Sequence, residues 1–187
     1  MSTQVQRCAW VNADPLYIAY HDEEWGIPKY GDQELFELLI LEGMQAGLSW
    51  YTVLKKREAF REAFDHFNPE RIAAYDEEKI EELMSNPGII RNRLKIQSTI
   101  TNARIYLDVM EEGSFSELLW SFTEGVPLVN HWRDVTEVPA VTPQSDQMSR
   151  MLRKRGMKFV GSTICYAFMQ ASGMVDDHTM DCFCRKQ

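Results

Sequence analysis

The stretch from Leu35 to Arg57, LFELLILEGMQAGLSWYTVLKKR, decides the fold. Its first part is apolar on nearly every face, which is typical of a helix that is buried on all sides. Glu42 interrupts this apolar region. Because an unpaired buried carboxylate is costly, Glu42 must reach water, find a partner or line a cavity. Gly47 then ends the helix, and Ser49 is well placed to cap a second helix that begins at Trp50.

This stretch allows two interpretations. Glu42, the glycine-bearing turn and Trp50 fall within a few residues of one another, so they could hold a flat ligand against an aromatic face with an acceptor at its edge. Alternatively, Glu42 is simply exposed and Trp50 belongs to the core. The stretch alone does not decide between a ligand site and an ordinary helix pair.

Length and composition indicate one soluble globular domain covering residues 1–187, with 44% hydrophobic and 26% charged residues. No apolar run approaches the roughly 20 residues that span a bilayer, and the N-terminus lacks the apolar core of a signal peptide. We therefore expect a cytoplasmic protein with no membrane partner. In that compartment the 4 cysteines favour metal or thiol roles over disulfides.

The formal net charge is −8, which argues against a nucleic-acid partner because phosphate contacts dominate affinity for DNA. The basic residues are clustered, however, so net charge is a poor guide. They fall into three groups along the chain. The first is Arg91, Arg93, Lys95 and Arg104, the second is Arg150, Arg153, Lys154, Arg155 and Lys158, and the third is Lys55, Lys56, Arg57 and Arg61. These segments are either a polyanion-binding surface or solvated helix faces.

Hydrophobic periodicity and capping residues predict an all-α fold with no strand. The first expected helix begins at Asp14-Pro15 and runs to His21. The others run from Asp32 to Met44 or Ala46, from Trp50 to Phe64, from Asn68-Pro69 to Tyr75, from Asp76 to Pro87, from Arg91 to Met110, from Ser114 to Phe122, from Thr142-Pro143 to Leu152 and from Val160 to Ser172. Residues 123–141 are expected to form an irregular connection, to which the sequence assigns no role.

The segment Leu83–Arg93, LMSNPGIIRNR, has the pattern of a helix-hairpin-helix covering about residues 77–110. Free N–H groups at the start of the second helix favour an anion, and Gly88, followed by Ile89, would let a phosphate approach the backbone. Arg91 and Arg93 flank this turn. Such a hairpin grips the DNA backbone without reading sequence, although any turn between two helices could look similar.

Both ends of the chain carry potential metal ligands. His178 and Cys182 have the spacing that places two side chains on one helical face, and Cys8 and His21 could complete a tetrahedral site. With its coordination filled, such a zinc would be structural and would join the two termini. Alternatively these are two pairs of ordinary residues, and Cys184 could replace Cys182 as a ligand.

Aromatic residues are concentrated near the N-terminus: Trp10, Tyr17, Tyr20, Trp25 and Trp50. Such a set usually belongs to a core. A base flipped out of DNA, however, needs aromatic faces for stacking and an acceptor at its edge, which Tyr20, Trp50 and Glu42 could supply.

Taken together, the motifs resemble the 3-methyladenine DNA glycosylase I family of helix-hairpin-helix glycosylases nearly end to end. The resemblance is carried by RCAWV at 7–11, DPLYIAYHDEEWG at 14–26, LEGMQAGLSW at 41–50, GIIRNR at 88–93, KFVGSTICYAFMQASG at 158–173 and VDDH at 175–178. It implies a helical fold with one structural Zn²⁺ held by Cys8, His21, His178 and Cys182.

The resemblance also implies roles in a base pocket. Glu42 and Tyr20 are expected to hydrogen-bond the excised base and Trp50 to stack on it, and the remaining wall is expected to come from Trp10, Tyr17 and Trp25. Leu48, beside Gly47, would probe the duplex where the base has left.

The implied reaction is hydrolysis of the N-glycosidic bond of 3-methyladenine in alkylated double-stranded DNA, the first step of base excision repair. We expect a monomer that releases free 3-methyladenine, with Glu42 as the catalytic carboxylate. Many helix-hairpin-helix relatives use an Asp beyond the hairpin, but Asp108 lies within the expected long helix and is interpreted as a surface residue. Since no lysine is expected among the pocket aromatics, the enzyme should be monofunctional, without Schiff-base chemistry.

Two other function classes fit parts of the sequence. A non-enzymatic, zinc-stabilised DNA-binding module would keep the hairpin and the basic segments but would not need Glu42 and its aromatic neighbours. A hydrolase with a catalytic zinc would need an open coordination position on the metal.

Overall fold

Helices dominate residues 5–186, the part of the chain that a computed structural model describes. The helices are α1 Pro15–Glu23, α2 Asp32–Met44, α3 Trp50–Leu54, α4 Arg57–Ala63, α5 Pro69–Ala73, α6 Glu77–Ser85, α7 Arg93–Glu112, α8 Phe115–Trp120, α9 Pro143–Lys154 and α10 Ser162–Ala171. The predicted all-α class is confirmed. Among the described residues, no helix combines the length and apolarity needed to cross a bilayer.

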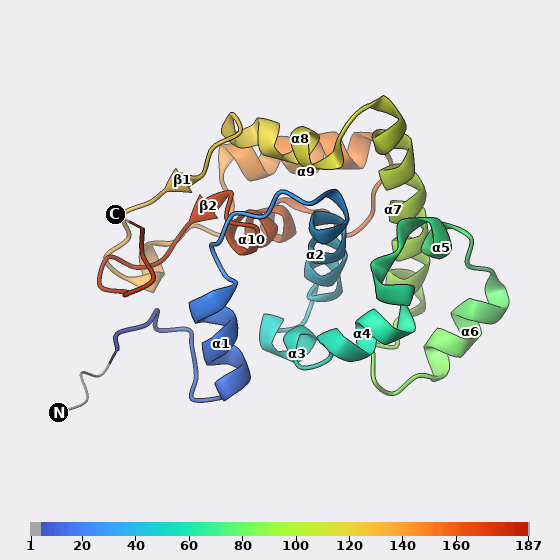
Figure 1. The fold of residues 1–187 in the computed structure, drawn as a ribbon, viewed down its shortest axis with the longest axis horizontal. Coiled ribbons are helices and arrows are strands. Elements are labelled where there is room, and N and C mark those ends of the chain that lie inside the picture. The colour runs from blue at the N-terminus through green and yellow to red at the C-terminus, as the bar shows by residue number, and fades with distance from the viewer. Residues whose placement is uncertain (1–4, 187) are drawn as a thin grey trace.

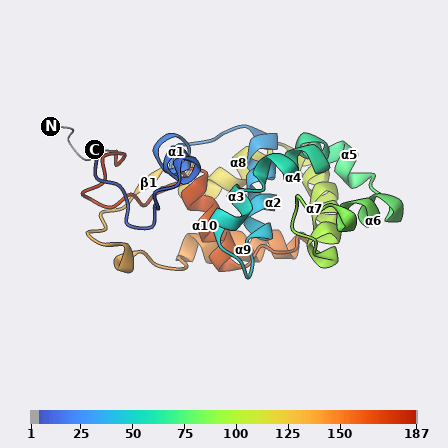
Figure 2. The same cartoon turned by 90° about the horizontal axis from the view of Figure 1, so that it is seen from below.

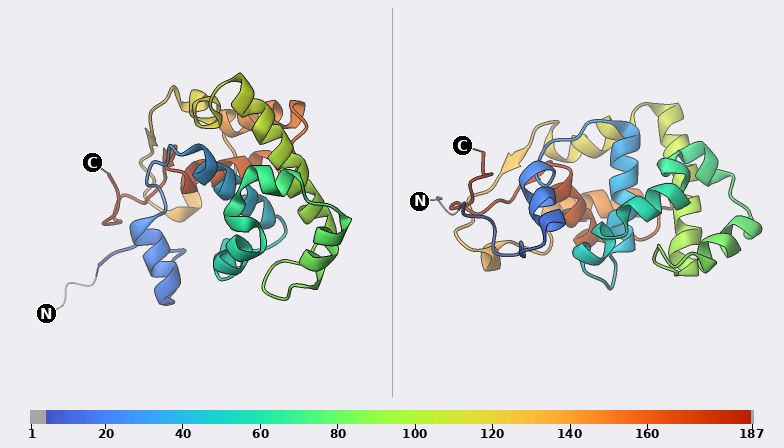
Figure 3. Two further views of the ribbon diagram at one scale, coloured as in Figure 1. Left: turned by 45° about the vertical axis from the view of Figure 1, so that its right-hand side comes forward. Right: turned by 60° about the horizontal axis from the view of Figure 1, so that its bottom comes forward.

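Helix α2 forms the centre of the core. Its side chains Leu35, Phe36, Leu39 and Leu41 are almost completely buried, as the apolar run predicted. Around it pack α7, α8 and α10, which come from distant parts of the chain (Figure 1 and Figure 3). Residues at the end of α2 are therefore held by rigid helices on several sides.

Side-chain caps start the helices largely where the sequence placed them. The capping side chains that accept a backbone N–H in the first turn of an α-helix are Asp14, Ser49, Asn68, Asp76, Asn92, Ser114 and Thr142. Asp32 does not cap α2, which begins at Asp32 itself after Gly31. The Asp32 carboxylate instead accepts hydrogen bonds from the Ser114 hydroxyl and the Ser116 amide, both at 2.8 Å, and so joins the starts of α2 and α8.

The single helix expected from Trp50 to Phe64 is wrong, because the chain breaks after Leu54 into α3 and α4. Lys56 leaves the helical region at φ −102° and ψ 0°. The break redirects α4 so that the Arg57 guanidinium reaches both carboxylate oxygens of Glu24 after α1, at 2.6 and 2.9 Å. An ion pair between residues distant in the sequence thus accompanies a break in a segment with good helix propensity.

The absence of strands was also predicted wrongly. Leu128–Val129 (β1) pairs in parallel with Val175–Asp176 (β2), with Leu128 opposite Val175. Two residues per strand are too few to produce a recognisable alternation. The pair anchors the irregular 123–141 connection to the segment that follows α10.

Both ends of the described chain lie at the same end of the molecule, beside α1, β1 and β2, while α5, α6 and α7 lie at the other end (Figure 1 and Figure 2). The Phe183 amide donates to the Gln6 carbonyl at 3.0 Å, and the Arg7 guanidinium lies 5.4 Å from the centre of the Phe183 ring. The N- and C-terminal segments are therefore in direct contact.

A substitution at Gly173, which follows the end of α10, can test how closely the chain packs against Ile27 and Pro28. Gly173 has φ +74°, and a Cβ there would lie 2.3 Å from the Pro28 nitrogen. We expect Gly173→Ala to lower the free energy of unfolding by roughly 2 kcal/mol or more, because strain and overlap add. Gly113→Ala is the matched control, since Gly113 has extended backbone and open space around its Cβ direction. Urea denaturation measures both variants, and equal losses would contradict the packing described here.

Candidate active site and metal centre

Helices α1, α2, α3 and α10 enclose a cavity of about 180 Å³. Its lining residues are Cys8, Trp10, Tyr17, Tyr20, Trp25, Glu42, Gln45, Trp50, Val135, Val138, Ala167, Gln170, Asp177 and Thr179. Every residue predicted to contact a flipped base lies in this lining. The structure thus brings Glu42 and the predicted aromatic set together, and their roles in binding stay predictions.

Glu42 lies in the last full turn of α2 and is only 2% exposed. Among the described residues, its Oε2 atom has no hydrogen-bond partner. Burial alone raises the pKa of Glu42 to about 8, because no cation nearby compensates the loss of hydration. Of the alternatives that the sequence left open, Glu42 therefore lines a cavity.

Aromatic rings form most of the cavity wall. The ring centroids of Tyr20 and Trp50 are 5.4 Å apart. The ring centroid of Trp10 lies 5.0 Å from that of Tyr17 and 5.0 Å from that of Trp25. Burial, with a smaller contribution from Glu42, raises the pKa of Tyr20, so its hydroxyl keeps its proton and can donate. The indole Nε1 of Trp50 is buried and has no partner among the described residues.

Gln45 is a cavity residue that the sequence analysis missed. It follows Glu42 by three positions, which places both side chains on the same side of the chain as α2 ends. Its Oε1 atom is buried without a partner in the described chain. Helical spacing from Glu42 was the signal that could have found it.

Asp177 organises the opposite wall. This buried carboxylate accepts hydrogen bonds from Asn130 Nδ2 and Trp132 Nε1, both at 2.7 Å, from Gln170 Nε2 at 2.9 Å, and from the Tyr166 hydroxyl. The irregular connection is thus held against the end of the chain. It contributes Val135 and Val138 to the cavity, a role that no local pattern in residues 123–141 indicated.

The turn after α2 presents an apolar side chain on the surface. Gly47 has φ +77°, which glycine adopts without strain, and within the described part of the chain nothing lies within 4 Å of the position of a Cβ. Leu48, the next residue, is 43% exposed although it is large and apolar. The structure therefore leaves Leu48 accessible to a partner, and its predicted contact with DNA stays a prediction.

The segment predicted to form the hairpin connects α6 and α7, and its identity as a helix-hairpin-helix stays a prediction. Gly88 makes close contacts, since a Cβ there would lie 3.0 Å from Asn86 Oδ1, and its own amide already donates to that oxygen at 2.8 Å. Ile89 is buried beneath the turn, whereas Arg91 is exposed. Arg93 forms ion pairs with Glu77 and Glu81 of α6, so part of its charge is already compensated.

Asp108, in α7, is exposed, as the sequence analysis expected. It does not line the cavity described above. Glu42 is therefore the carboxylate that combines burial, a raised pKa and a position beside the aromatic rings.

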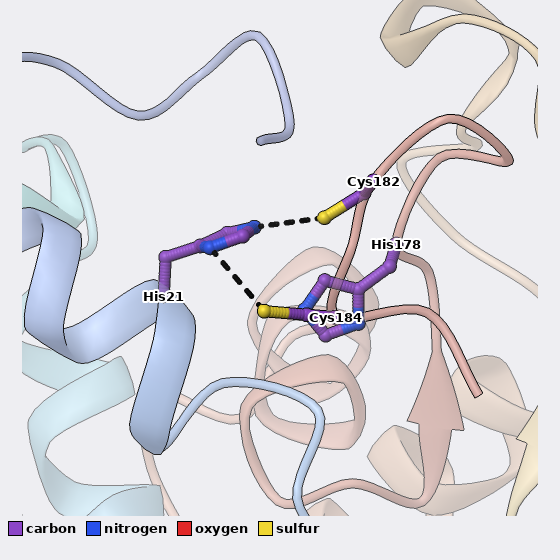
Figure 4. Close-up of side chains that lie close together, drawn as sticks. All are labelled: His21, His178, Cys182 and Cys184. Carbon is purple, nitrogen blue, oxygen red and sulfur yellow. Dashed lines mark hydrogen bonds between the residues drawn. The ribbon is translucent and has the colours of Figure 1, made fainter. Parts of the chain in front are cut away.

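Side chains from both ends of the chain form a compact potential metal site. The ligand atoms of His21, His178, Cys182 and Cys184 all lie within 4.8 Å of one another (Figure 4). Cys182 Sγ lies 3.5 Å from Nε2 of His21, and Cys184 Sγ lies 4.0 Å from Nδ1 of the same ring. Cys8 is buried beside this group, with the Thr179 hydroxyl 3.8 Å from its sulfur.

The ring nitrogens of both histidines are arranged as in a metal site. Asp22 Oδ1 binds Nδ1 of His21, and Asp176 Oδ1 binds Nδ1 of His178, each at 2.7 Å. Carboxylates in this position orient metal-binding histidines and leave Nε2 for the metal. His178 Nε2 is buried and has no partner among the described residues, so the donor set fits a zinc ion.

Comparisons with known proteins agree over nearly the whole chain. A family described as methyladenine glycosylase matches residues 10–185. DNA-3-methyladenine glycosylase 1 of Escherichia coli (strain K12) is 52% identical over 181 residues, covering 96% of this chain and 97% of the relative. DNA-3-methyladenine glycosylase of Haemophilus influenzae is 49% identical over 180 residues, covering 96% and 97%.

Solved structures with the same fold also cover nearly the whole chain. A crystal structure of 3-methyladenine DNA glycosylase I has a TM-score of 0.95 at 54% identity, covering 97% of this chain and 100% of that one. The Staphylococcus aureus 3-methyladenine DNA glycosylase I, solved to describe 3-methyladenine recognition, has a TM-score of 0.93 at 38% identity, covering 97% of each chain.

The burial of Glu42 predicts a pH dependence of stability. The unfolded chain releases the Glu42 proton near the ordinary pKa of 4.5, whereas the folded chain keeps it up to about pH 8. Between these values the folded state binds more protons, so this contribution to stability is complete below pH 4.5 and is lost as the pH rises to about 8. We expect Glu42→Gln to remove this decline, as measured by urea denaturation at several pH values. Parallel pH profiles for the two proteins would show that Glu42 is not buried in this way.

Proposed function

Because the chain belongs to the methyladenine glycosylase family, we propose that it excises 3-methyladenine from alkylated duplex DNA by hydrolysing the N-glycosidic bond. This reaction is the first step of base excision repair. The observation that carries the proposal is the buried Glu42 carboxyl group, unpartnered at Oε2, in the wall of an aromatic cavity. Such a site is suited to a flat, positively charged ligand, because the carboxyl group and the aromatic faces both favour a cation.

Selection follows from charge. Methylation at N3 gives the adenine ring a positive charge, which normal adenine lacks. A cation in the cavity would lower the raised pKa of Glu42 and favour its carboxylate form, so protein and base stabilise each other's charge. The faces of the Trp50 and Tyr20 rings add cation–π attraction to the same methylated base. Neutral adenine gains neither contribution.

The charge on the base also explains the chemistry required. A cationic base is already a good leaving group, so the protein need not protonate it strongly. Glu42 holds the departing base and favours separation from an oxocarbenium-like sugar, to which water then adds. None of the residues lining the cavity is a lysine, which supports a monofunctional enzyme without a Schiff-base step.

The base must leave the helical stack to reach this cavity. Leu48, exposed on the turn after Gly47, would fill the gap left in the duplex. The hairpin with Gly88 and Ile89 would hold the DNA backbone, with Arg91 as its exposed cation. Arg93 would stabilise the hairpin through its ion pairs to α6 while contributing less charge to DNA.

A structural zinc is the cofactor that we propose. Cys8, His21, His178 and Cys182 would hold it, because Nε2 of His21 faces the Cys182 sulfur while Cys184 lies on the Nδ1 side. The ion would crosslink the two ends of the chain and take no part in hydrolysis. We further propose a monomer acting in the cytoplasm, without a membrane partner.

Release of free bases from methylated duplex DNA, resolved by chromatography, tests the glycosylase proposal. We expect release of 3-methyladenine with little 7-methylguanine. Glu42→Gln should lower the rate by about 10²-fold or more, because the buried carboxylate is lost while the shape of the pocket is kept. Full activity and unchanged lesion preference in this variant would contradict the role of Glu42.

The same assay separates the glycosylase from the alternative, a zinc-stabilised DNA-binding module. Folded, zinc-loaded protein that binds damaged DNA without releasing bases would favour the binding module. Efficient β-elimination on an abasic duplex would instead contradict the monofunctional mechanism.

Metal analysis tests the zinc proposal. We expect about one zinc per chain, and its removal by a chelator should lower the unfolding temperature, because a structural zinc contributes folding free energy. Cys8→Ser and Cys182→Ser should lose the metal, whereas Cys184→Ser should retain it. Retention in Cys8→Ser together with loss in Cys184→Ser would replace Cys8 by Cys184 in the ligand set.

A further inference from the structure

Lys95, in the first turn of α7, is a buried lysine without an acidic partner among the described residues. Its side chain is 6% exposed, and Nζ donates to the carbonyl oxygens of Met44 at 2.8 Å and Ala46 at 2.6 Å. These carbonyls belong to the last residue of α2 and to the turn directly after it, where the helix dipole favours a positive charge. The ammonium group therefore binds the backbone of the segment that leads into the turn carrying Gly47 and Leu48.

The other bonds of this turn are local. The Ala46 amide donates to Gly43 and the Leu48 amide to Gln45, at 3.2 and 2.6 Å. Apart from its chain neighbours, no atom of the described residues lies within 4 Å of the position that a Cβ of Gly47 would take. The bonds from Lys95 are thus long-range restraints on an otherwise exposed turn, and they come from the helix that follows the hairpin.

Helix α7 gives these restraints a rigid base. The Asn102 side chain exchanges two hydrogen bonds with the backbone of Lys158, at 2.9 and 2.8 Å, and so fixes α7 against the segment before α10. The ring of Phe159 in that segment lies 6.0 Å from Lys95 Nζ. Gly43 of α2 contacts the same segment, since a Cβ there would lie 3.3 Å from Phe159 Cβ.

Lys95 does not pair with Glu42 among the described residues. Its Nζ atom donates to the Met44 and Ala46 carbonyls, and Oε2 of Glu42 has no hydrogen-bond partner there. The role of Lys95 must therefore be sought in the backbone that it binds.

We propose that Lys95 is a positioning residue that holds the Gly47–Leu48 turn in register with the hairpin of residues 86–92, so that both contact the DNA as one rigid unit. The proposal rests on the function proposed above. Correct placement of Leu48 would then depend on a side chain that contacts neither the base nor the cavity.

Lys95→Met removes the charge and both hydrogen bonds while keeping similar length and apolar packing. Arg133→Met is the matched control, because Arg133 is exposed, lies outside the three basic segments, and its replacement changes the net charge equally. In single-turnover base excision we expect about a ten- to hundredfold slower rate for Lys95→Met and little change for the control, because small misplacements of reacting groups are costly. Affinity for free 3-methyladenine, followed by tryptophan fluorescence, should stay within about twofold, because the cavity residues are not altered.

A double-mutant cycle with Leu48→Ala distinguishes positioning from general destabilisation. If Lys95 acts through Leu48, adding Lys95→Met to Leu48→Ala should slow excision by less than about twofold further. Additive losses, or an equal loss of affinity for the free base, would overturn the proposal.

Hydrogen exchange provides a measurement independent of activity. Lys95→Met should increase exchange of the amides at residues 45–48 and leave those of the central part of α2 unchanged. An unchanged turn would overturn the proposal even if the wild-type protein is an active glycosylase. Failure of the wild-type protein to release any base would refute the proposed function instead. If Lys95→Met does not fold, Lys95→Gln is measured in the same way, and the same changes are expected at a smaller size because its side-chain amide can still donate.

Discussion

The burial of one carboxyl group without a compensating cation is the constraint on which this molecule depends. Glu42 lies in a helix whose other buried residues are apolar, so its position costs free energy in the empty protein. The surrounding helices must be stable enough to bear that cost. A positively charged base placed beside Glu42 reverses the balance, which links the energetics of folding directly to the choice of substrate.

The cavity around Glu42 is completed by the ends of the chain. Cys8 and Thr179 line the cavity and also border the potential metal site. Asp177 lies between Asp176 and His178, and its hydrogen bonds hold the connection that supplies Val135 and Val138. A metal ion that joined the termini would therefore stabilise one wall of the pocket without entering the reaction.

Local patterns in the sequence predicted the helical class, most helix starts and the central position of α2, because caps and apolar runs act within a few residues. Glu42 and the aromatic residues of the cavity were predicted from their chemistry and from the family resemblance, whereas Gln45 was missed. The break at Lys56, the β1–β2 pair and the cavity contacts of Val135 and Val138 could not be predicted in this way. Each depends on a partner distant in the sequence, such as Glu24 for Arg57 or Asp177 for Trp132. Lys95 belongs to the same class, since nothing in its neighbours shows that α2 supplies its acceptors.

A direct titration of Glu42 tests the central claim that an uncompensated carboxyl group senses a cationic base. Carbon-13 NMR of protein labelled at the glutamate carboxyl carbons, with the resonance assigned by its absence in Glu42→Gln, follows this group alone. The account predicts a pKa of about 8 in the free protein, because of burial, and a markedly lower pKa when an N-methylated cationic purine is bound. A pKa near the ordinary 4.5 in the free protein, unchanged by the ligand, would contradict it.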